Sequence, residues 1–283
     1  MGDDAHKGFG DSVHTCMFYQ CLLLQFPCSL QWLLEANGTR AELRAALNES
    51  ITTMVSRYRG KIYAWHAVME PFGDPHWRQP VWKENLLYSA FGPSYVDMVF
   101  EIAQAADPHA KLCLLDYQIS WGMYAGGVWD HSKADMVYGL VAAMKRNRTS
   151  SLSRHLACIC METHLEPTVP ANRTGYDWLR RNFDRYHSIG VEVHLNAVTI
   201  SVNGFDRAWN QSQKFAAQAT WYRILIQACV DSPACVDFEP YGLTDKYDMG
   251  ETPIYSLPFD TNFQPKPAFW AMVDVLENRT RVN

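Results

Sequence analysis

The feature that most constrains the fold is a regular alternation of short apolar runs with amphipathic segments, joined by short polar links. Short apolar runs are typical of buried strands, and apolar residues three or four positions apart are typical of helices. Because the two kinds of segment alternate along the chain, the sequence predicts parallel βα units. We find no internal repeat and no change of composition, so we expect residues 1–283 to form a single domain.

The helix with the strongest local signals covers residues 39–58. Thr39 and Glu42 have the spacing of a capping box, and apolar residues follow at helical spacing until Gly60. The other predicted helices cover residues 95–106, 133–145, 176–187, 213–227 and 268–276. The predicted strands cover residues 61–68, 111–115, 155–161, 191–200 and 236–241.

The charge pattern limits the classes of partner. The formal net charge is −5, and the sequence has neither a basic patch nor a run of like charges. This argues against nucleic acid or an anionic membrane as the main partner. The most apolar early stretch, residues 16–34, is interrupted by glutamine, proline and serine and is too polar to span a membrane. We expect a monomer that needs no cofactor.

Two features indicate an extracellular protein, although residues 1–14 do not resemble a signal peptide. The first is a set of Asn-x-Ser/Thr sequons, of which about one would be expected by chance. They begin at Asn37, Asn48, Asn147, Asn172, Asn210 and Asn278. The second is a pair of cysteines, Cys229 and Cys235, which bracket a Ser-Pro turn and are expected to form a disulfide.

The other six cysteines are expected to be buried thiols. Cys158 and Cys160 share one face of a predicted strand, where the geometry is unsuitable for a disulfide between them. No matching Cys or His pair accompanies them, so we expect no metal site.

Several sequence segments have the order and spacing of one family's motifs. Residues 57–70, RYRGKIYAWHAVME, resemble a helix ending in R-Y-x-G-K followed by a strand reading Y-x-W-D-V-V-N-E. Residues 106–118, ADPHAKLCLLDYQ, resemble A-D-P-x-A-K-L-x-x-N-D-Y-N. Residues 158–165, CICMETHL, and 190–199, GVEVHLNAVT, resemble G-I-G-L-Q-S-H-L and G-L-E-V-H-I-T-E-L-D. Residues 242–245 and 259–268 resemble the closing W-G-x-T-D and F-D-x-N-Y-Q-P-K-P-A.

Together these segments resemble glycoside hydrolase family 10, the endo-β-1,4-xylanases, over about residues 13–276. The resemblance implies an α/β fold of the TIM (β/α)₈ barrel type with its site at the C-terminal ends of the strands. The family's first two βα units have no counterpart here, so we expect an incomplete barrel of six parallel strands that begins near the third strand. The family places a disulfide at Cys229 and Cys235 in its fungal members.

The resemblance also implies retaining hydrolysis of xylan, in which two carboxyl groups lie about 5–5.5 Å apart. The acid/base maps to Glu70. The nucleophile maps to Ala197, whose methyl group cannot attack carbon. The family's sugar-binding residues map to Tyr19 with Phe18 before it, Met69, Glu162, His164, Tyr241 and Met249.

Two other carboxylates are candidates to replace the nucleophile. Glu192 has the wrong strand parity relative to Ala197, so we expect it to face the outer helices. Glu162 lies in the right region. Three functions stay open: a weak xylanase, a catalytically inactive protein that binds β-1,4-linked sugar, and a non-functional fragment. Loss of one member of a catalytic unit commonly lowers the rate by about 10⁴, so we expect xylan hydrolysis at least roughly a thousandfold below that of a typical member.

Overall fold

The computed structural model describes residues 39–74, 81–121, 123–125, 128–147, 154–168, 171–248 and 254–277 of the 283-residue chain. The chain divides into two compact units. Unit 1 comprises Met1–Gly73, Pro80–Leu115 and Met144–Cys158, and unit 2 comprises Asp74–Gln79, Asp116–Ala143 and Ile159–Asn283. The expected sixth strand, near His14, lies outside the described residues.

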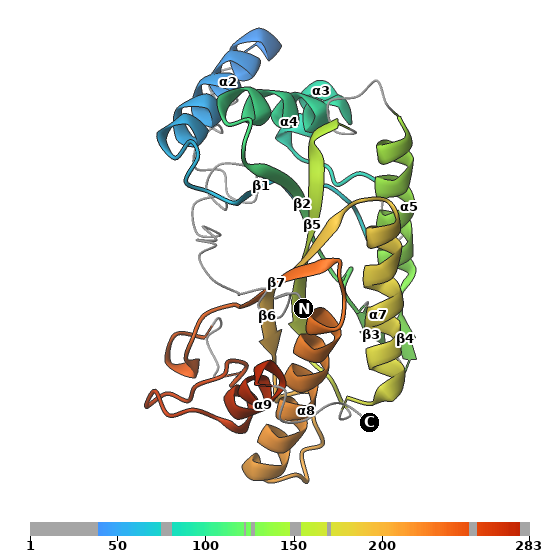
Figure 1. Cartoon of the computed structure of the whole chain (residues 1–283), viewed down its shortest axis with the longest axis vertical. Helices are drawn as coiled ribbons and strands as arrows, with labels where there is room; N and C mark the ends of the chain where they lie inside the picture. Colours follow the sequence, from blue (N-terminus) through green and yellow to red (C-terminus); the bar gives the residue numbers. More distant parts are fainter. Residues whose placement is uncertain are drawn as a thin grey trace, which may run out of the picture. The chain divides into compact units, whose positions relative to one another are not determined.

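Unit 1 contains the helices α2 (Arg40–Arg57), α3 (Leu86–Phe91) and α4 (Ser94–Ala106), the strand β1 (Ala64–Met69) and the first part of β2 (Lys111–Tyr117). The Thr39–Glu42 capping box begins α2 as the sequence predicts. Its buried leucine, isoleucine and valine side chains form one stripe, and α2 packs against α4 (Figure 1). The short helix α3, which the sequence analysis missed, is capped by Asn85.

Unit 2 contains the helices that follow the later strands. They are α7 (Arg173–Ser188), α8 (Gln211–Val230), α9 (Pro267–Leu276) and most of α5 (Ser132–Arg146). The strands are β6 (Glu192–Ile200), β7 (Cys235–Pro240), most of β5 (Leu156–Leu165), and the antiparallel pair β3 (Met123–Ala125) and β4 (Val128–Asp130). A 3₁₀ turn, η3, covers Asp245–Tyr247. Helix α8 packs on α9 (Figure 1).

The five long strands form one sheet in the order β1-β2-β5-β6-β7, which is also their order in the chain. Strand β1 pairs in parallel with β2, and β6 pairs in parallel with β7. Helices connect these strands, as expected of parallel βα units. All five strands lie where the sequence predicts them, which confirms the α/β prediction. The β3–β4 pair was not predicted.

The cysteines correct part of the sequence analysis. Cys229 and Cys235 form the expected disulfide between the end of α8 and the start of β7. Cys113 and Cys158 form a second disulfide, so the expectation of thiols at these two positions is wrong. They lie on β2 and β5, which are neighbours in the sheet and bring together residues 45 apart in the chain. Cys158 and Cys160 are not bonded to each other, as expected.

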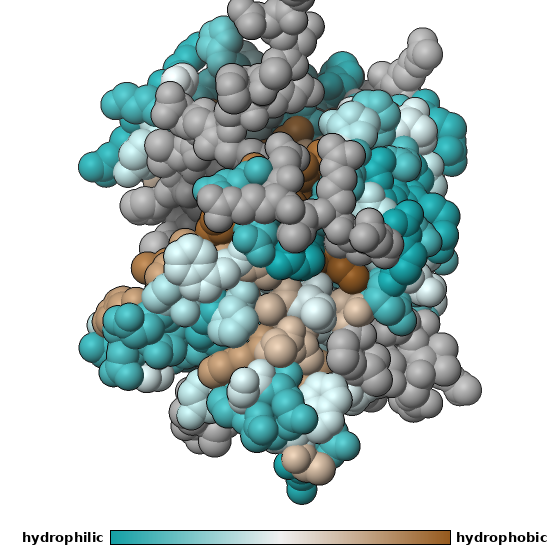
Figure 2. Space-filling view, turned by 60° about the horizontal axis from the view of Figure 1, so that its bottom comes forward, coloured by the Kyte–Doolittle hydropathy of each residue, from teal (hydrophilic) through white to brown (hydrophobic). Residues whose placement is uncertain are grey.

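Within the described residues, no helix is long and apolar enough to cross a membrane. Hydrophilic residues occupy much of the face shown in Figure 2, and hydrophobic residues lie between them in smaller areas. The buried hydrophobic residues come from strands and from helices, and the strand residues Val68, Leu114 and Ile159 have no exposed surface.

Candidate active site

Glu70 lies directly after β1, at the C-terminal end of the strand. Its backbone has a φ of 45°, an uncommon value for a residue other than glycine, and its N–H donates to the carbonyl oxygen of Leu115 at 2.7 Å. The residue is 7% exposed. Its carboxylate accepts a hydrogen bond from the Lys83 ammonium, with a distance of 2.5 Å between Nζ and Oε2. The structure therefore places a cation beside the carboxylate that the sequence predicts to be the acid/base.

The segment that carries Lys83 is tied to the segment that follows Glu70. The Lys83 N–H donates to the Pro71 carbonyl oxygen at 2.9 Å, and Phe72 and Trp82 form a backbone bridge. The Phe72 and Trp82 rings also contact each other, with centroids 5.2 Å apart. This second connection keeps Lys83 near Glu70. Met69, the last residue of β1, is buried and pairs with Leu115 of β2.

The second group of site residues lies in unit 2, on β5. The Asn182 amide of α7 lies 4.0 Å from the Met161 sulfur, so Met161 faces α7. Alternation along the strand then places Glu162 and His164 on the opposite face. Glu162 is 7% exposed, whereas His164 is exposed to solvent.

His164 connects three strands of this unit. Its Nδ1 lies 2.8 Å from the Thr199 hydroxyl on β6, and its ring packs edge-on against the Tyr241 ring, with centroids 5.7 Å apart. Tyr241 follows β7 and is held there by a hydrogen bond from its N–H to the Val198 carbonyl oxygen at 3.0 Å. The structure therefore brings together two of the predicted sugar-binding residues, His164 and Tyr241.

Ala197 lies within β6, three residues before its end, and is 5% exposed. Like Glu70 it has a positive φ, here 50°. The β6–β7 register is interrupted at this point, because Leu195 pairs with Phe238 but Val198 pairs with Pro240. Asn196 donates from Nδ2 to Oε2 of Glu239 on β7 at 2.6 Å. A carboxylate therefore lies on the strand beside the alanine.

The expectation that Glu192 faces the outer helices is wrong. Its carboxylate lies 4.0 Å from Nε2 of His194, and Nδ1 of His194 lies 3.8 Å from the Asp237 carboxylate on β7. These contacts place the side chains of Glu192, His194 and Asp237 together. The parity argument fails because the pairing of β6 with β7 is irregular twice between Glu192 and Ala197, first between Val193 and His194 and again between Leu195 and Val198.

A buried group of charged side chains lies at the end of β2 in unit 2. The Lys133 ammonium, which has no exposed surface, lies 2.8 Å from the Asp116 carboxylate and 3.1 Å from that of Asp74. It also lies over the Tyr117 ring, whose hydroxyl donates to Asp74 at 2.6 Å. Two carboxylates and one ring thus surround a single cation, which fixes the start of α5 to the end of β2.

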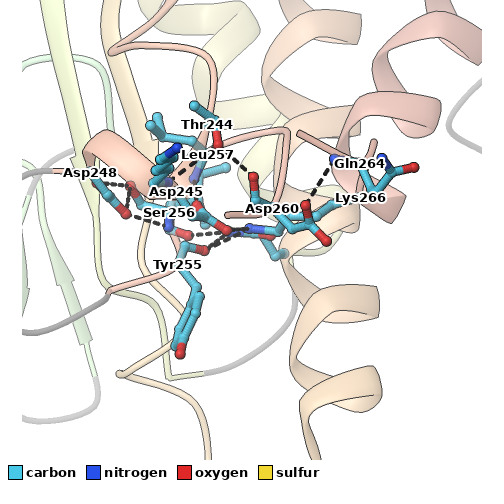
Figure 3. Close-up of polar contacts among 12 residues, drawn as sticks. Thr244, Asp245, Asp248, Tyr255, Ser256, Leu257, Asp260, Gln264 and Lys266 are labelled. Carbon is cyan, nitrogen blue, oxygen red and sulfur yellow. Dashed lines mark hydrogen bonds and ion pairs between the residues drawn. The ribbon is translucent and has the colours of Figure 1, made fainter. Parts of the chain in front are cut away.

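A second polar network holds the segment after Tyr241 (Figure 3). The Lys266 ammonium contacts the Asp245 carboxylate at 2.8 Å and the Tyr255 carbonyl oxygen at 2.9 Å, while the Tyr255 ring points away from the network. Burial raises the pKa of Asp245 and lowers the pKa of Lys266 from their ordinary values, although each partner opposes the shift of the other. The Asp248 carboxylate accepts from the Ser256 N–H and hydroxyl.

Three of the predicted site residues, Phe18, Tyr19 and Met249, lie outside the described residues. Three residues that the sequence analysis missed are Lys83, Asn196 and Glu239. Strand alternation could have indicated Glu239, because it lies on β7 two residues before Tyr241, which follows the strand. No sequence signal indicates that Lys83 lies beside Glu70.

The parallel βα units, with polar side chains at the C-terminal ends of β1, β5 and β7, define an α/β protein of the TIM-barrel class. The model of glycosyl hydrolase family 10 matches residues 7–275. The chain belongs to this family.

Similar proteins agree with this assignment. Endo-1,4-beta-xylanase A of Phanerodontia chrysosporium is 31% identical over 261 residues, which are 90% of this chain and 56% of that protein. Endo-1,4-beta-xylanase C of the same organism is 29% identical over 260 residues, which are 90% of this chain and 57% of that protein. The chain thus spans a little over half the length of these curated relatives. Among solved structures, xylanase 10B from Thermotoga maritima has a TM-score of 0.75 at 26% identity, covering 91% of this chain and 73% of that one. Xylanase 10B from Thermotoga petrophila RKU-1, solved in complex with xylobiose, has a TM-score of 0.73 at 26% identity. The match covers 88% of this chain and 70% of that one.

Proposed function

We propose that the chain acts on β-1,4-xylan by slow retaining hydrolysis, with Glu70 as the acid/base. The observation that carries the proposal is the position of Glu70 in a chain of this family, directly after β1 and hydrogen-bonded to Lys83. A retaining enzyme needs this group twice, first to protonate the leaving oxygen and then to deprotonate the water that attacks the glycosyl-enzyme.

We expect the rate to be low because Ala197 occupies the nucleophile position. The environment supports substrate contact through Tyr241 and His164, whose rings pack together. Met69 should weaken the positioning of sugar, since a thioether cannot donate to a hydroxyl as an amide does. We therefore expect hydrolysis at least roughly a thousandfold below that of a family member with both carboxylates.

The experiment measures reducing-sugar release from xylan by the purified protein and its Glu70→Gln variant. We expect the slow activity of the unaltered protein to fall at least about a hundredfold in the variant, in the range typical of acid–base catalysis. Glu49→Gln, an exposed change on α2, is the matched control and should leave the activity unchanged. Equal activity of the Glu70→Gln and unaltered proteins would contradict the proposal.

The second candidate is a protein that binds β-1,4-linked sugar without hydrolysing it, and Ala197 is the observation that favours it. Calorimetric titration with xylo-oligosaccharides separates the two functions. Binding without any reducing-sugar release, even with long incubation, would support the second candidate.

We also propose that the chain is a secreted glycoprotein that works as a single domain. The exposed sequon residues Asn48, Asn172 and Asn210 support glycosylation. Disulfides in two places support an oxidising compartment. Secretion and glycan mass, measured in a eukaryotic host with and without peptide-N-glycosidase treatment, test this proposal.

A further inference from the structure

We propose that Glu239 supplies the second carboxylate of the site, in place of the one that Ala197 lacks. The inference rests on the proposed function and names a catalytic residue for it. Glu239 lies on β7, and all the contacts used to argue its role lie within unit 2.

The strand register places Glu239 beside Ala197. Leu195 pairs with Phe238 and Val198 pairs with Pro240, so Asn196 and Ala197 on β6 lie opposite the single residue Glu239 on β7. Two residues opposite one is the pattern of a β-bulge, which commonly redirects a side chain near an active site. Neighbouring strands are about 4.8 Å apart, a distance that a glutamate side chain can bridge.

The hydrogen bond from Asn196 fixes the direction of the Glu239 carboxylate. The Asn196 amide is 4% exposed, and its Nδ2 lies 2.6 Å from Oε2 of Glu239. The carboxylate is therefore held toward the strand that carries Ala197. Glu239 itself is only half-buried, whereas Asn196 and Ala197 are buried.

The face of the sheet also fits the proposed role. Glu239 lies on β7, and Tyr241 follows the strand two positions later, where its N–H still donates to the Val198 carbonyl oxygen of β6. The alternation of the strand therefore places both side chains on the same face. The Tyr241 ring contacts His164, which is exposed on the side of β5 turned away from α7. The carboxylate therefore shares a face with the two predicted sugar-binding residues. Glu162, the replacement considered from sequence, lies on β5, but the strand register and the Asn196 hydrogen bond favour Glu239.

The chemistry balances with this residue as the nucleophile. A Glu239 oxygen attacks the anomeric carbon as the glycosidic C–O bond breaks, and the leaving oxygen takes a proton from the general acid of the proposed function. The product of this step is a glycosyl ester on Glu239. Water, deprotonated by the same acid/base group, then attacks the anomeric carbon and releases the Glu239 carboxylate.

The test uses an activated 2-deoxy-2-fluoroxylobioside, which slows the release of a glycosyl-enzyme, followed by mass spectrometry of the protein and its peptides. We expect a label on the peptide that contains Glu239 and no label in the Glu239→Gln variant. The isosteric glutamine retains an oxygen that can accept from Asn196, so the fold should be maintained. The turnover of an aryl xylobioside should fall at least about a hundredfold in this variant. Asp231→Asn, an exposed change in unit 2, is the control.

Two variants separate the failure of this inference from the failure of the proposed function. Addition of azide to Glu239→Ala should restore aryl xylobioside cleavage and give a glycosyl azide of inverted configuration, a result that a purely structural residue would not produce. A label on Glu162, or undiminished turnover in Glu239→Gln, would overturn the role of Glu239 alone. The role of Glu239 would also be overturned if the unaltered protein were inactive and the Ala197→Glu variant were active. If the unaltered protein and the Ala197→Glu variant are both inactive, the proposed function fails together with the role of Glu239.

Discussion

The Lys83 ammonium and the Glu70 carboxylate lie 2.5 Å apart, although the residues are separated by 13 positions in the chain. The Glu70 side chain is 8% exposed and that of Lys83 is 35% exposed, so the pair is only partly screened by water. Because a buried carboxylate that loses its cation is costly, this contact stabilises the turn after β1.

We expect Lys83→Met to lower the free energy of unfolding by about 1 kcal/mol, a value kept small because the lysine is partly exposed. Urea unfolding followed by circular dichroism measures the change. Lys61→Met, at an exposed lysine of the same unit, is the control. Equal stability of Lys83→Met and the control would show that the ion pair contributes nothing to stability.

The positive φ of Ala197 predicts that glycine is tolerated better than alanine at this position. A left-handed backbone costs a residue with a Cβ atom roughly 1–2 kcal/mol, whereas glycine adopts it freely. After allowance for the greater entropy of glycine in the unfolded chain, we expect Ala197→Gly to be neutral or to stabilise by up to about 1 kcal/mol. Ala64→Gly in β1 lacks a positive φ and should destabilise by about 1 kcal/mol.

The two disulfides close loops of different length, and their contributions to stability should differ accordingly. Cys113 and Cys158 are 45 residues apart, while Cys229 and Cys235 are 6 apart. The chain-entropy relation gives about 4 kcal/mol for the longer loop and about 2 kcal/mol for the shorter one. Paired serine substitutions at each disulfide, compared by thermal and urea unfolding, test the order. A larger loss from the shorter loop would contradict the expectation.

Asn210 is both a sequon residue and the N-cap of α8, and the two roles use different atoms. Its Oδ1 accepts from the Gln213 N–H at 3.0 Å, whereas a glycan would be attached to Nδ2. We expect Asn210→Ala to cost about 1 kcal/mol, and Asn210→Asp to keep the cap while removing the glycan site. Ser212→Ala removes the sequon without changing the cap residue. Peptide mass mapping and unfolding of these three variants separate the two roles.

The elements of the fold could be predicted because their sequence signals are local and periodic. Helix α2 has its capping box at its first turn and its apolar stripe within the 18 residues that follow Thr39, and β2 contains an unbroken apolar run from residue 112 to residue 115. Helix α3 was missed because its six residues are too few to show a helical period. The family motifs located Glu70 and Ala197, but they could not show that Lys83 lies beside Glu70.

The other differences between the sequence predictions and the structure arise from the pairing of neighbouring strands. The bulge at Ala197 changes which side chains share a face, and alternation within one strand cannot reveal an extra residue relative to its neighbour. This is why Glu192 was placed on the wrong face and Glu239 was not considered. The Cys113–Cys158 bond was missed for a related reason, because it depends on β2 and β5 being neighbours in the sheet.

The last prediction concerns the dependence of stability on pH near His131. The imidazole stacks on the Trp178 ring, with centroids 3.6 Å apart and an interplanar angle of 15°. Burial lowers the pKa of His131 from its ordinary value of 6.5, an effect that the nearby Asp135 and Asp130 carboxylates only partly oppose. The unfolded chain therefore binds the proton more tightly than the folded protein does.

By linkage, the stability that this histidine contributes is present above the unfolded pKa of about 6.5 and is lost as the pH falls through the folded pKa. We expect the free energy of unfolding to decrease as the pH is lowered below about 6.5. His131→Phe keeps an aromatic ring against Trp178 but cannot take up a proton, so this variant should lose part of that decrease. Urea unfolding at closely spaced pH values from neutrality downward measures this decrease. Parallel curves for the variant and the unaltered protein across this range would show that His131 does not couple protonation to unfolding.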